Sequence, residues 1–440
     1  ADAALIEVVT VTPQDLKARD REHRWGKRRY LAMVLHHDAA IGFKDLGEAD
    51  AIDGAAQALL GQLRSTANQP QAAAEELYKL VLAPLLPLLA GNKRLYLSLD
   101  NQLNLVPFAA LHDGTDYLLS SYELNYLTSG RDLLRQSIGK APQGMVVMAN
   151  PDYQGGVLGH GLAPGAPAVP EQRGGLFAQL GQIPALPGTA EEARQIQGLL
   201  PVARVLQQGQ ASETAVRGLR APRILHIATH GVFLEAPVVS SGGRGVGIVE
   251  RRLSALPETG TSGKVGGAGA PAAVVDNPLN RSALLLAGAA QAARAPDRAQ
   301  DGLLTAQEVA GLELLGTELA VLSACDSGRG GLQTGQGVYG LRRAFVVAGV
   351  QTLVSSLWQV PDQETSELMV SMYQNLLAGK GRAEALQGAM RAMKQRKSHP
   401  YYWAPFISIG QTGPIELAPE LRARPGSRPG KGQGARPRGR

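Results

Sequence analysis

Short apolar runs, each ended by turn residues, constrain the fold of this chain more than any other feature of its sequence. They read as buried strands, and segments with helical spacing lie between them. Strands that alternate with helices are typical of βαβ units, so we predict an α/β fold with a mostly parallel sheet flanked by helices on both faces. The expected strands are Tyr30–His36, Arg94–Leu99, Gly144–Ala149, Ala203–Gln207, Arg223–Thr229, Glu318–Ala324 and Thr352–Trp358, and the expected helices are Thr189–Leu200, Ser212–Leu219, Gly337–Ala348 and Gln363–Leu377.

The helix expected at Thr189–Leu200 carries a local start signal. Thr189 followed three residues later by Glu192 matches the capping-box pattern, in which each side chain bonds the backbone N–H of the other residue. We therefore predict that Thr189 is the N-cap and that Glu192 reaches back to it.

Three segments interrupt the alternation of strands and helices. Residues 155–182 are rich in Gly and Pro, and residues 236–276 are expected to form a long mobile loop. This loop carries basic residues at Arg244 and Arg251-Arg252, and two alternatives stay open: cleavage there during activation, or a loop that is never processed. Residues 413–440 are expected to be a disordered basic tail.

The charge and cysteine content limit the function classes. From Arg422 onward the tail carries seven basic and no acidic residues, and subtracting them from the net charge of +6 leaves −1 for the rest of the 440-residue chain. Nucleic-acid binding is therefore expected only as a weak property of the tail. One cysteine excludes an internal disulfide framework and fits a reducing compartment, so we expect a cytoplasmic protein. The longest apolar run, Leu80–Ala90, contains two prolines and is too short to span a membrane.

Two of the predicted strands end in residues that can do chemistry. One strand leads into His230-Gly231, and another leads into Cys325 followed by a Gly-containing turn. If the strands are parallel neighbours, both side chains emerge at the carboxyl edge of the sheet, where α/β proteins place their sites. A thiol nucleophile needs such a histidine, and the backbone N–H groups of Gly231 and Cys325 are candidates to bind an oxyanion. Each segment alone has a plainer interpretation, since a cysteine that ends an apolar strand is often a small core residue. His226 is expected to be a core or supporting histidine.

Two other patterns in the sequence resemble cofactor or metal sites. Gly335-x-Gly337-x-x-Gly340 matches a dinucleotide fingerprint, yet it follows a loop and lacks the acidic residue expected about 20 positions later. His36-His37-Asp38 is better explained as the end of a strand, because neighbouring strand residues point to opposite faces. We predict neither a cofactor nor a metal.

Several blocks of this sequence resemble, in order, the blocks of the CHAT domain family, which is grouped with caspases, separases and gingipains. The two chemistry-bearing blocks are His226–Gly231 and Leu322–Gly328. The remaining blocks are Leu105–Leu111, Asn277–Ala283, Leu304–Val309, Gly335–Phe345, Ser356–Asp362 and His399–Phe406.

The resemblance implies a caspase-hemoglobinase fold and a cysteine endopeptidase acting on a protein substrate, with a catalytic dyad of His230 and Cys325. It covers residues 45–412, with a pseudo-N-terminal part at 45–140 and a catalytic part at 141–412, and residues 1–44 are expected to lead into this domain. The cysteine is followed by Asp-Ser-Gly, so caspase-type specificity for Asp is not implied. Many members carry helical repeats upstream, which implies a regulatory or helical-repeat partner here. The alternative is a catalytically silent scaffold with the same fold.

Asp362 is the candidate for substrate binding. It follows the strand expected at Thr352–Trp358, and in the resembling family this strand's exit borders the substrate cleft. A carboxylate there would pair with a guanidinium, so we expect a preference for a basic P1 residue. The alternative is that Asp362 caps the helix that begins near Gln363.

Overall fold

The computed structural model describes residues 2–14, 25–135, 143–155, 183–233, 279, 282–294, 300–323, 325–326, 335–358 and 360–415. The predicted loop at 236–276 and nearly all of the predicted tail at 413–440 lie outside the described residues, as does most of the Gly/Pro-rich stretch at 155–182.

Within the described residues, an 11-stranded sheet runs through the molecule in the order β3-β2-β1-β4-β5-β15-β14-β12-β8-β6-β7. Neighbouring strands are parallel except at β1/β2, β2/β3 and β14/β15. The mostly parallel sheet predicted from the sequence is therefore confirmed. The strands are β1 (Ala3–Val11), β2 (Arg29–His36), β3 (Ile41–Glu48), β4 (Arg94–Ser98), β5 (Glu123–Leu127), β6 (Gln143–Ala149), β7 (Arg204–Gln207), β8 (Pro222–Ala228), β12 (Leu319–Leu322), β14 (Thr352–Ser356) and β15 (Phe406–Gly410).

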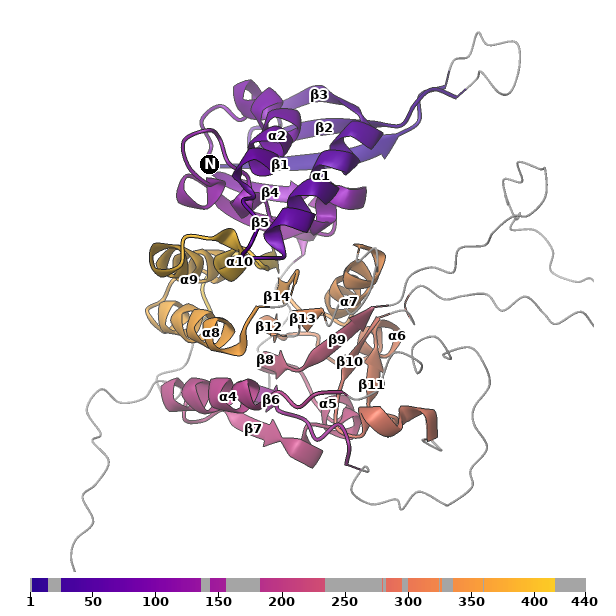
Figure 1. The fold of residues 1–440 in the computed structure, drawn as a ribbon, viewed down its shortest axis with the longest axis vertical. Coiled ribbons are helices and arrows are strands. Elements are labelled where there is room, and N and C mark those ends of the chain that lie inside the picture. The colour runs from indigo at the N-terminus through magenta and orange to yellow at the C-terminus, as the bar shows by residue number, and fades with distance from the viewer. Residues whose placement is uncertain are drawn as a thin grey trace, which may run out of the picture.

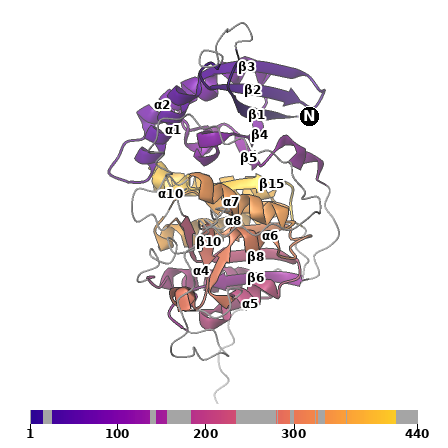
Figure 2. The same cartoon turned by 90° about the vertical axis from the view of Figure 1, so that its right-hand side faces the viewer.

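Helices cover the sheet, as the two views of the ribbon show (Figures 1 and 2). In Figure 1, α4 (Pro187–Leu199), α8 (Asp362–Leu377) and α9 (Arg382–Arg396) lie on one side of strands β12 and β8, and α7 (Gly335–Val347) lies on the other. Helices α1 (Ala49–Leu63) and α2 (Gln71–Val81) accompany the N-terminal strands, where β3 is an edge strand. Short helices are α5 (Glu213–Arg217), α6 (Ala306–Ala310) and α10 (Pro400–Trp403), with 3₁₀ turns at Ala83–Leu88, Asn101–Leu105, Phe108–Ala110, Leu118–Ser120, Gly130–Leu134, Gln208–Gln210 and Ala289–Arg294.

The central strands form in segments that are mostly apolar or carry only small polar side chains. Every residue of β12 and β14 is buried, as expected for parallel strands covered on both faces. The edge strand β3 has the opposite character, with Ile41 56% and Phe43 70% exposed. The apolar run Leu80–Ala90 is not one continuous helix, because α2 ends at Val81 and a 3₁₀ turn that contains Pro87 follows.

The capping box predicted at Thr189 and Glu192 is wrong. Helix α4 starts at Pro187, a residue whose fixed φ and missing N–H suit the first helical position, and its N-cap is Leu186. The Thr189 hydroxyl donates to the Leu186 carbonyl and accepts from the Asn150 backbone N–H, both at 2.8 Å. Glu192 is consequently one turn inside the helix and points into the protein, where 2% of it is exposed.

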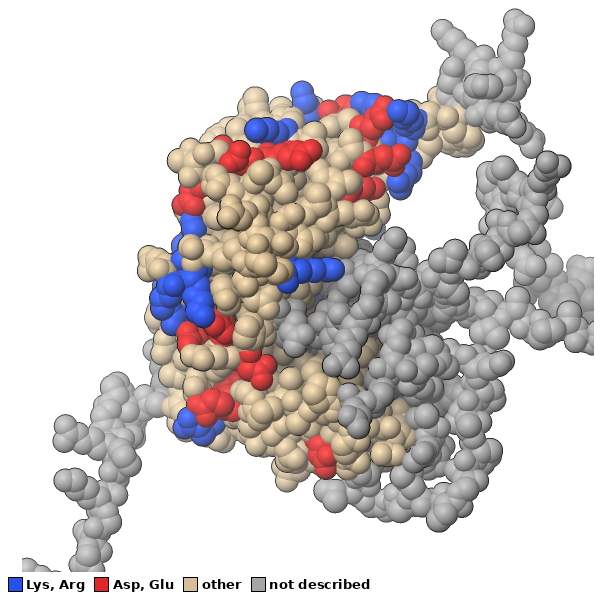
Figure 3. All heavy atoms as spheres, viewed as in Figure 1, with Lys and Arg blue, Asp and Glu red and all other residues tan. Residues whose placement is uncertain are grey.

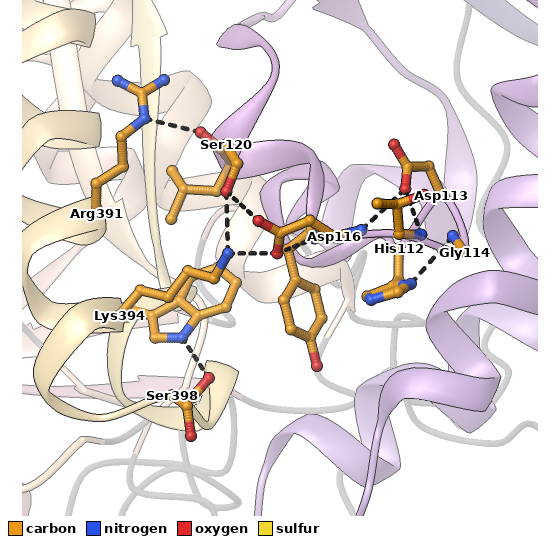
Figure 4. A network of polar contacts seen from close by, with 12 residues as sticks. His112, Asp113, Gly114, Asp116, Ser120, Arg391, Lys394 and Ser398 are labelled. Atoms are coloured by element: carbon orange, nitrogen blue, oxygen red, sulfur yellow. Dashed lines mark hydrogen bonds and ion pairs between the residues drawn. The ribbon is translucent and has the colours of Figure 1, made fainter.

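The N-terminal and C-terminal halves are joined by α9 as well as by the sheet. Figure 4 shows Lys394 of α9 bound to Asp116 and, at 2.9 Å, to the hydroxyl of Ser120. Arg391 donates to the Leu119 carbonyl at 2.9 Å. Strands β1 and β2 lie within residues 1–44 and pair in the same sheet. The domain boundaries at residues 45 and 141 remain predictions.

Charges of both signs lie together on the face shown in Figure 3. The basic side chains of α9 lie beside the acidic side chains of α8, where Arg396 contacts Glu367 at 2.6 Å and Lys397 contacts Glu364 at 2.5 Å. Across the described ranges, the helices are all too short or too polar to cross a membrane.

Candidate active site

Strands β8 and β12 are parallel neighbours, with His226 opposite Val321 and Ile227 opposite Leu322. Beyond their carboxyl ends the described residues form a small second sheet in the order β11-β10-β9-β13. Its strands are β9 (His230–Phe233), β10 (Ser282–Leu285), β11 (Leu303–Thr305) and β13 (Cys325–Asp326).

The second sheet brings the two predicted catalytic positions together. Strands β9 and β13 are parallel, and their register places Cys325 opposite His230. Neighbouring strands lie about 4.8 Å apart, so two positions separated by 95 residues in the sequence become adjacent in the fold. Figure 1 shows β9 and β13 close to the ends of β8 and β12.

His230 is buried and held by one ring nitrogen. It is 4% exposed, and its Nε2 lies 2.9 Å from the carbonyl oxygen of Pro184. A carbonyl only accepts hydrogen bonds, so Nε2 carries the hydrogen, and in the neutral ring Nδ1 has the lone pair that can take a proton. Tyr153 packs against the ring with centroids 5.4 Å apart, and its hydroxyl lies 2.9 Å from the hydroxyl of Thr229.

The electrostatic environment of His230 favours the neutral ring. Burial lowers the pKa of His230, and the bond to Pro184 and the charge of Asp362 oppose that shift only in part. A neutral imidazole near pH 7 is able to accept a proton from a thiol, which is the first requirement of a base in thiol chemistry.

Asp362 lies beside His230 at the start of α8 and is half-buried. Pro361 occupies the N-cap position, so the alternative that Asp362 caps a helix beginning at Gln363 is wrong. Its carboxylate instead accepts a hydrogen bond from the backbone of Gly188 in α4. A Cβ at Gly188 would lie 2.3 Å from that of Asp362, so only glycine allows this approach.

Burial and the nearby Glu192 raise the pKa of Asp362, while Gly188 and His230 lower it.

A small cavity of about 10 Å³ lies among these groups, which is about enough room for one water molecule. It has no room for a guanidinium group, so an arginine side chain could reach Asp362 only if the cavity widened. The cavity is lined by Leu186, Thr189, Glu192, Thr229, His230, Ser323, Asp362 and Thr365. A larger cavity of about 140 Å³ lies elsewhere, between Arg135, Val346 and Gln411, and does not include His230.

Gly231 lies in the interior of the second sheet. It is opposite Asp326 on one side and opposite Leu284 on the other. The oxyanion-binding roles of the Gly231 and Cys325 N–H groups remain predictions. Among the described residues, no group of three His, Cys, Asp or Glu side chains is arranged to hold a metal ion.

Sequence reasoning missed three groups at this site: the Pro184 carbonyl, Glu192 and Ser323. Pro184 acts through its backbone oxygen, which carries no side-chain signal. The sequence predicts a helix-cap role for Glu192, and it gives Ser323 no role of its own within the block Leu322–Gly328. Only proximity in the fold reveals these groups.

The sequence matches a family model and several known proteins. A model of the CHAT domain matches residues 71–411. Tetratricopeptide repeat protein 28 of Homo sapiens is 27% identical over 335 residues, which cover 72% of this chain and 12% of that protein. The Mus musculus protein of the same name is 36% identical over 110 residues, covering 24% of this chain and 4% of that protein. This chain therefore spans only a small part of either relative.

Solved structures also align with this chain, among them the following two. The separase–securin complex of Saccharomyces cerevisiae aligns with a TM-score of 0.38 at 10% identity, covering 72% of this chain and 15% of that chain. The Arg-specific cysteine proteinase gingipain R aligns with a TM-score of 0.35 at 11% identity, covering 85% of this chain and 74% of that chain.

Proposed function

This chain belongs to the CHAT domain family, and we propose that it is a cysteine endopeptidase that cleaves a protein substrate with Cys325 as nucleophile and His230 as general acid and base. The observation that carries the proposal is the pairing of His230 with Cys325 in neighbouring parallel strands. The bond from His230 Nε2 to Pro184 supports it, because that bond leaves Nδ1 as the basic nitrogen.

The proposed reaction has two halves. His230 takes the thiol proton, the thiolate of Cys325 attacks the peptide carbonyl carbon, and a C–S bond forms while the carbonyl oxygen becomes an oxyanion. As the C–N bond breaks, His230 gives its proton to the leaving amine. Water then attacks the thioester carbonyl carbon while His230 accepts a proton from it. As the C–S bond breaks, the acid is released and His230 gives that proton to the sulfur, which restores the thiol.

The proposed substrate has a basic P1 residue, with Asp362 as its counter-charge. Support comes from two carboxylates, Asp362 and Glu192, that line one cavity with His230. Because that cavity is small, arginine binding requires α4 and α8 to separate near Gly188. The cytoplasm remains the proposed compartment, since it keeps a lone thiol reduced.

The second candidate is a scaffold with the same fold that does not cleave peptides. The observation that favours it is the similarity to proteins that are named for tetratricopeptide repeats and not for peptidase activity. A helical-repeat or other regulatory partner is part of both proposals.

Cleavage of a peptide library by four purified proteins tests the dyad: wild type, Cys325→Ala, His230→Ala and the double variant. We expect each single variant to lose activity by at least about 100-fold, and the double variant to be no worse than either. The exposed His37→Ala variant is the matched control and should cleave like wild type. Cleavage by Cys325→Ala at the wild-type rate, or a double variant far less active than both singles, contradicts the dyad.

Matched peptides with Arg, Lys, Asp or Leu at P1 test Asp362. Wild type should prefer Arg, and Asp362→Asn should lose that preference while still cleaving other peptides. Equal turnover of the Arg and Leu peptides by wild type rejects the P1 assignment and leaves the dyad standing.

A further inference from the structure

A buried carboxylate lines the small cavity with His230 and takes no part in the proton transfers and bond changes proposed above. Glu192 extends from α4 and is 2% exposed. One oxygen, Oε1, lies 3.1 Å from Nε2 of His226, and the other, Oε2, accepts a hydrogen bond from the Ser323 hydroxyl at 3.2 Å. Each oxygen of one carboxylate therefore contacts a different part of the sheet.

The first contact continues into α8. His226 is fully buried in β8, and its Nδ1 lies 3.0 Å from the hydroxyl of Tyr373. Burial, together with the charge of Glu192, raises the pKa of Tyr373 well above its usual value, so this hydroxyl stays protonated and can donate to Nδ1. Nε2 then carries the ring hydrogen and lies 3.1 Å from Oε1 of Glu192, a close contact without hydrogen-bond geometry, so the ring lies between Tyr373 and Glu192.

The two contacts fall near the carboxyl ends of the paired strands. His226 is four residues before His230, and Ser323 is two residues before Cys325. The backbone N–H of Ser323 donates to the Ile227 carbonyl at 3.0 Å, so the two strand exits are already adjacent. Helix α4 is itself held against α8, where Ser366 donates to Gln195 at 3.3 Å.

We propose that Glu192 is a positioning residue that fixes the exits of β8 and β12 relative to each other and thereby sets the placement of Cys325 against His230. The inference rests on the proposed Cys325–His230 dyad. Glu192 also lines the small cavity together with His230 and Asp362, so it is close to both side chains of the site.

The chemistry of a carboxylate suits this role. One oxygen accepts a hydrogen bond from Ser323 and the other faces the His226 ring at 3.1 Å, so both can attract a hydrogen, whereas a glutamine of the same size has one acceptor and one donor group. Burying a charge is expensive, and an apolar side chain would stabilise this position at least as well. A charged residue here is therefore explained by its two directed contacts. The geometry matters because a misplacement of about 1 Å can lower a rate by about 100-fold.

The test follows alkylation of Cys325 by iodoacetamide as a function of pH. Cys325 is the only cysteine of the chain, so the reaction reports one site and needs no substrate. We expect Glu192→Gln to lower the rate constant at pH 7 by at least about tenfold and to shift its pH profile, with the folded protein intact by circular dichroism. Glu191→Gln is the matched control, because Glu191 is the preceding residue of α4 and its side chain pairs with Arg194 and Gln195 of the same helix.

Ser323→Ala provides a milder variant if Glu192→Gln does not fold. It removes a single hydrogen bond, and we expect a rate about threefold below that of wild type. A folded Glu192→Gln with the wild-type rate and profile overturns the inference, as does a wild-type rate in Ser323→Ala when Glu192→Gln fails to fold. Failure of the proposed dyad gives a different result in the same assay, because Cys325 of His230→Ala would then be alkylated as fast as in wild type.

Discussion

Glu213 is a buried carboxylate whose ionisation should make the stability of this protein depend on pH. It is the first residue of α5, is 2% exposed, and accepts a 2.7 Å hydrogen bond from the N–H of Gly302. Burial, Asp301 and Glu308 raise the pKa of Glu213 to about 7, while Gly302 and Arg217, 3.6 Å away, oppose the shift. Gly302 immediately precedes β11, so Glu213 stabilises the second sheet, in which His230 lies.

The size of the change in the free energy of unfolding follows from the difference between the pKa of Glu213 in the folded protein and in the unfolded protein. Glu213 has a reference pKa of 4.5 and a folded value of about 7, and a gap of this size corresponds to about 3 kcal/mol. A raised folded pKa gives stability that is fully present below pH 4.5 and is lost as the pH rises through about 7. Glu213→Gln cannot ionise and keeps an oxygen that can accept from Gly302. The free energy of unfolding of wild type relative to this variant should therefore fall by about 3 kcal/mol between pH 4.5 and 8.

The assay is urea denaturation of both proteins at half-unit steps of pH. Glu313→Gln is the matched control, since the side chain of Glu313 is 71% exposed, and its difference from wild type should stay flat. A flat difference for Glu213→Gln over the same range would refute the argument that burial raises this pKa.

Two further predictions concern a buried arginine and the pH dependence of catalysis. Arg382→Met should lower the free energy of unfolding by about 3 kcal/mol, because buried Arg382 donates at 2.8 Å to the carbonyls of both Glu318 and Gly413. Urea denaturation measures this, and a loss under about 1 kcal/mol, the size typical of an exposed ion pair, contradicts it. Asp362→Asn should move the acid limb of the rate profile to lower pH, because the charge of Asp362 raises the pKa of His230. Kinetics from pH 4 to 8 with a Leu-P1 peptide check this. An acid limb that stays at the same pH or moves to higher pH contradicts the effect of Asp362 on the pKa of His230.

The sequence was sufficient to predict those strands whose burial can be read from their own residues. Strands β8, β12 and β14 are short, almost fully buried segments, and each was predicted with boundaries within about two residues, the usual margin for such assignments. Edge strand β3 was missed because most of its residues are exposed and it shows no apolar alternation. Strand β13 has two residues, which is too few to produce any pattern.

The supporting groups of the site were beyond sequence reasoning for a different reason. Glu192 satisfies a helix-start pattern by spacing alone, yet its partners His226 and Ser323 lie 34 and 131 residues away in the sequence. Local patterns decide between helix and strand, but such distant contacts depend on strand order and register. The pairing of His230 with Cys325 was foreseeable only as a consequence of assuming that two strands are parallel neighbours.

The most direct measurement is covalent capture of Cys325 by a peptidyl acyloxymethyl ketone with arginine at P1, located by mass spectrometry. If the two residues form a catalytic dyad, wild type should be labelled at Cys325, and His230→Ala should be labelled at least about 100-fold more slowly while keeping its fold. Labelling of both proteins at the same rate, or no labelling of folded wild type, would contradict the assignment of His230 and Cys325 as a catalytic pair.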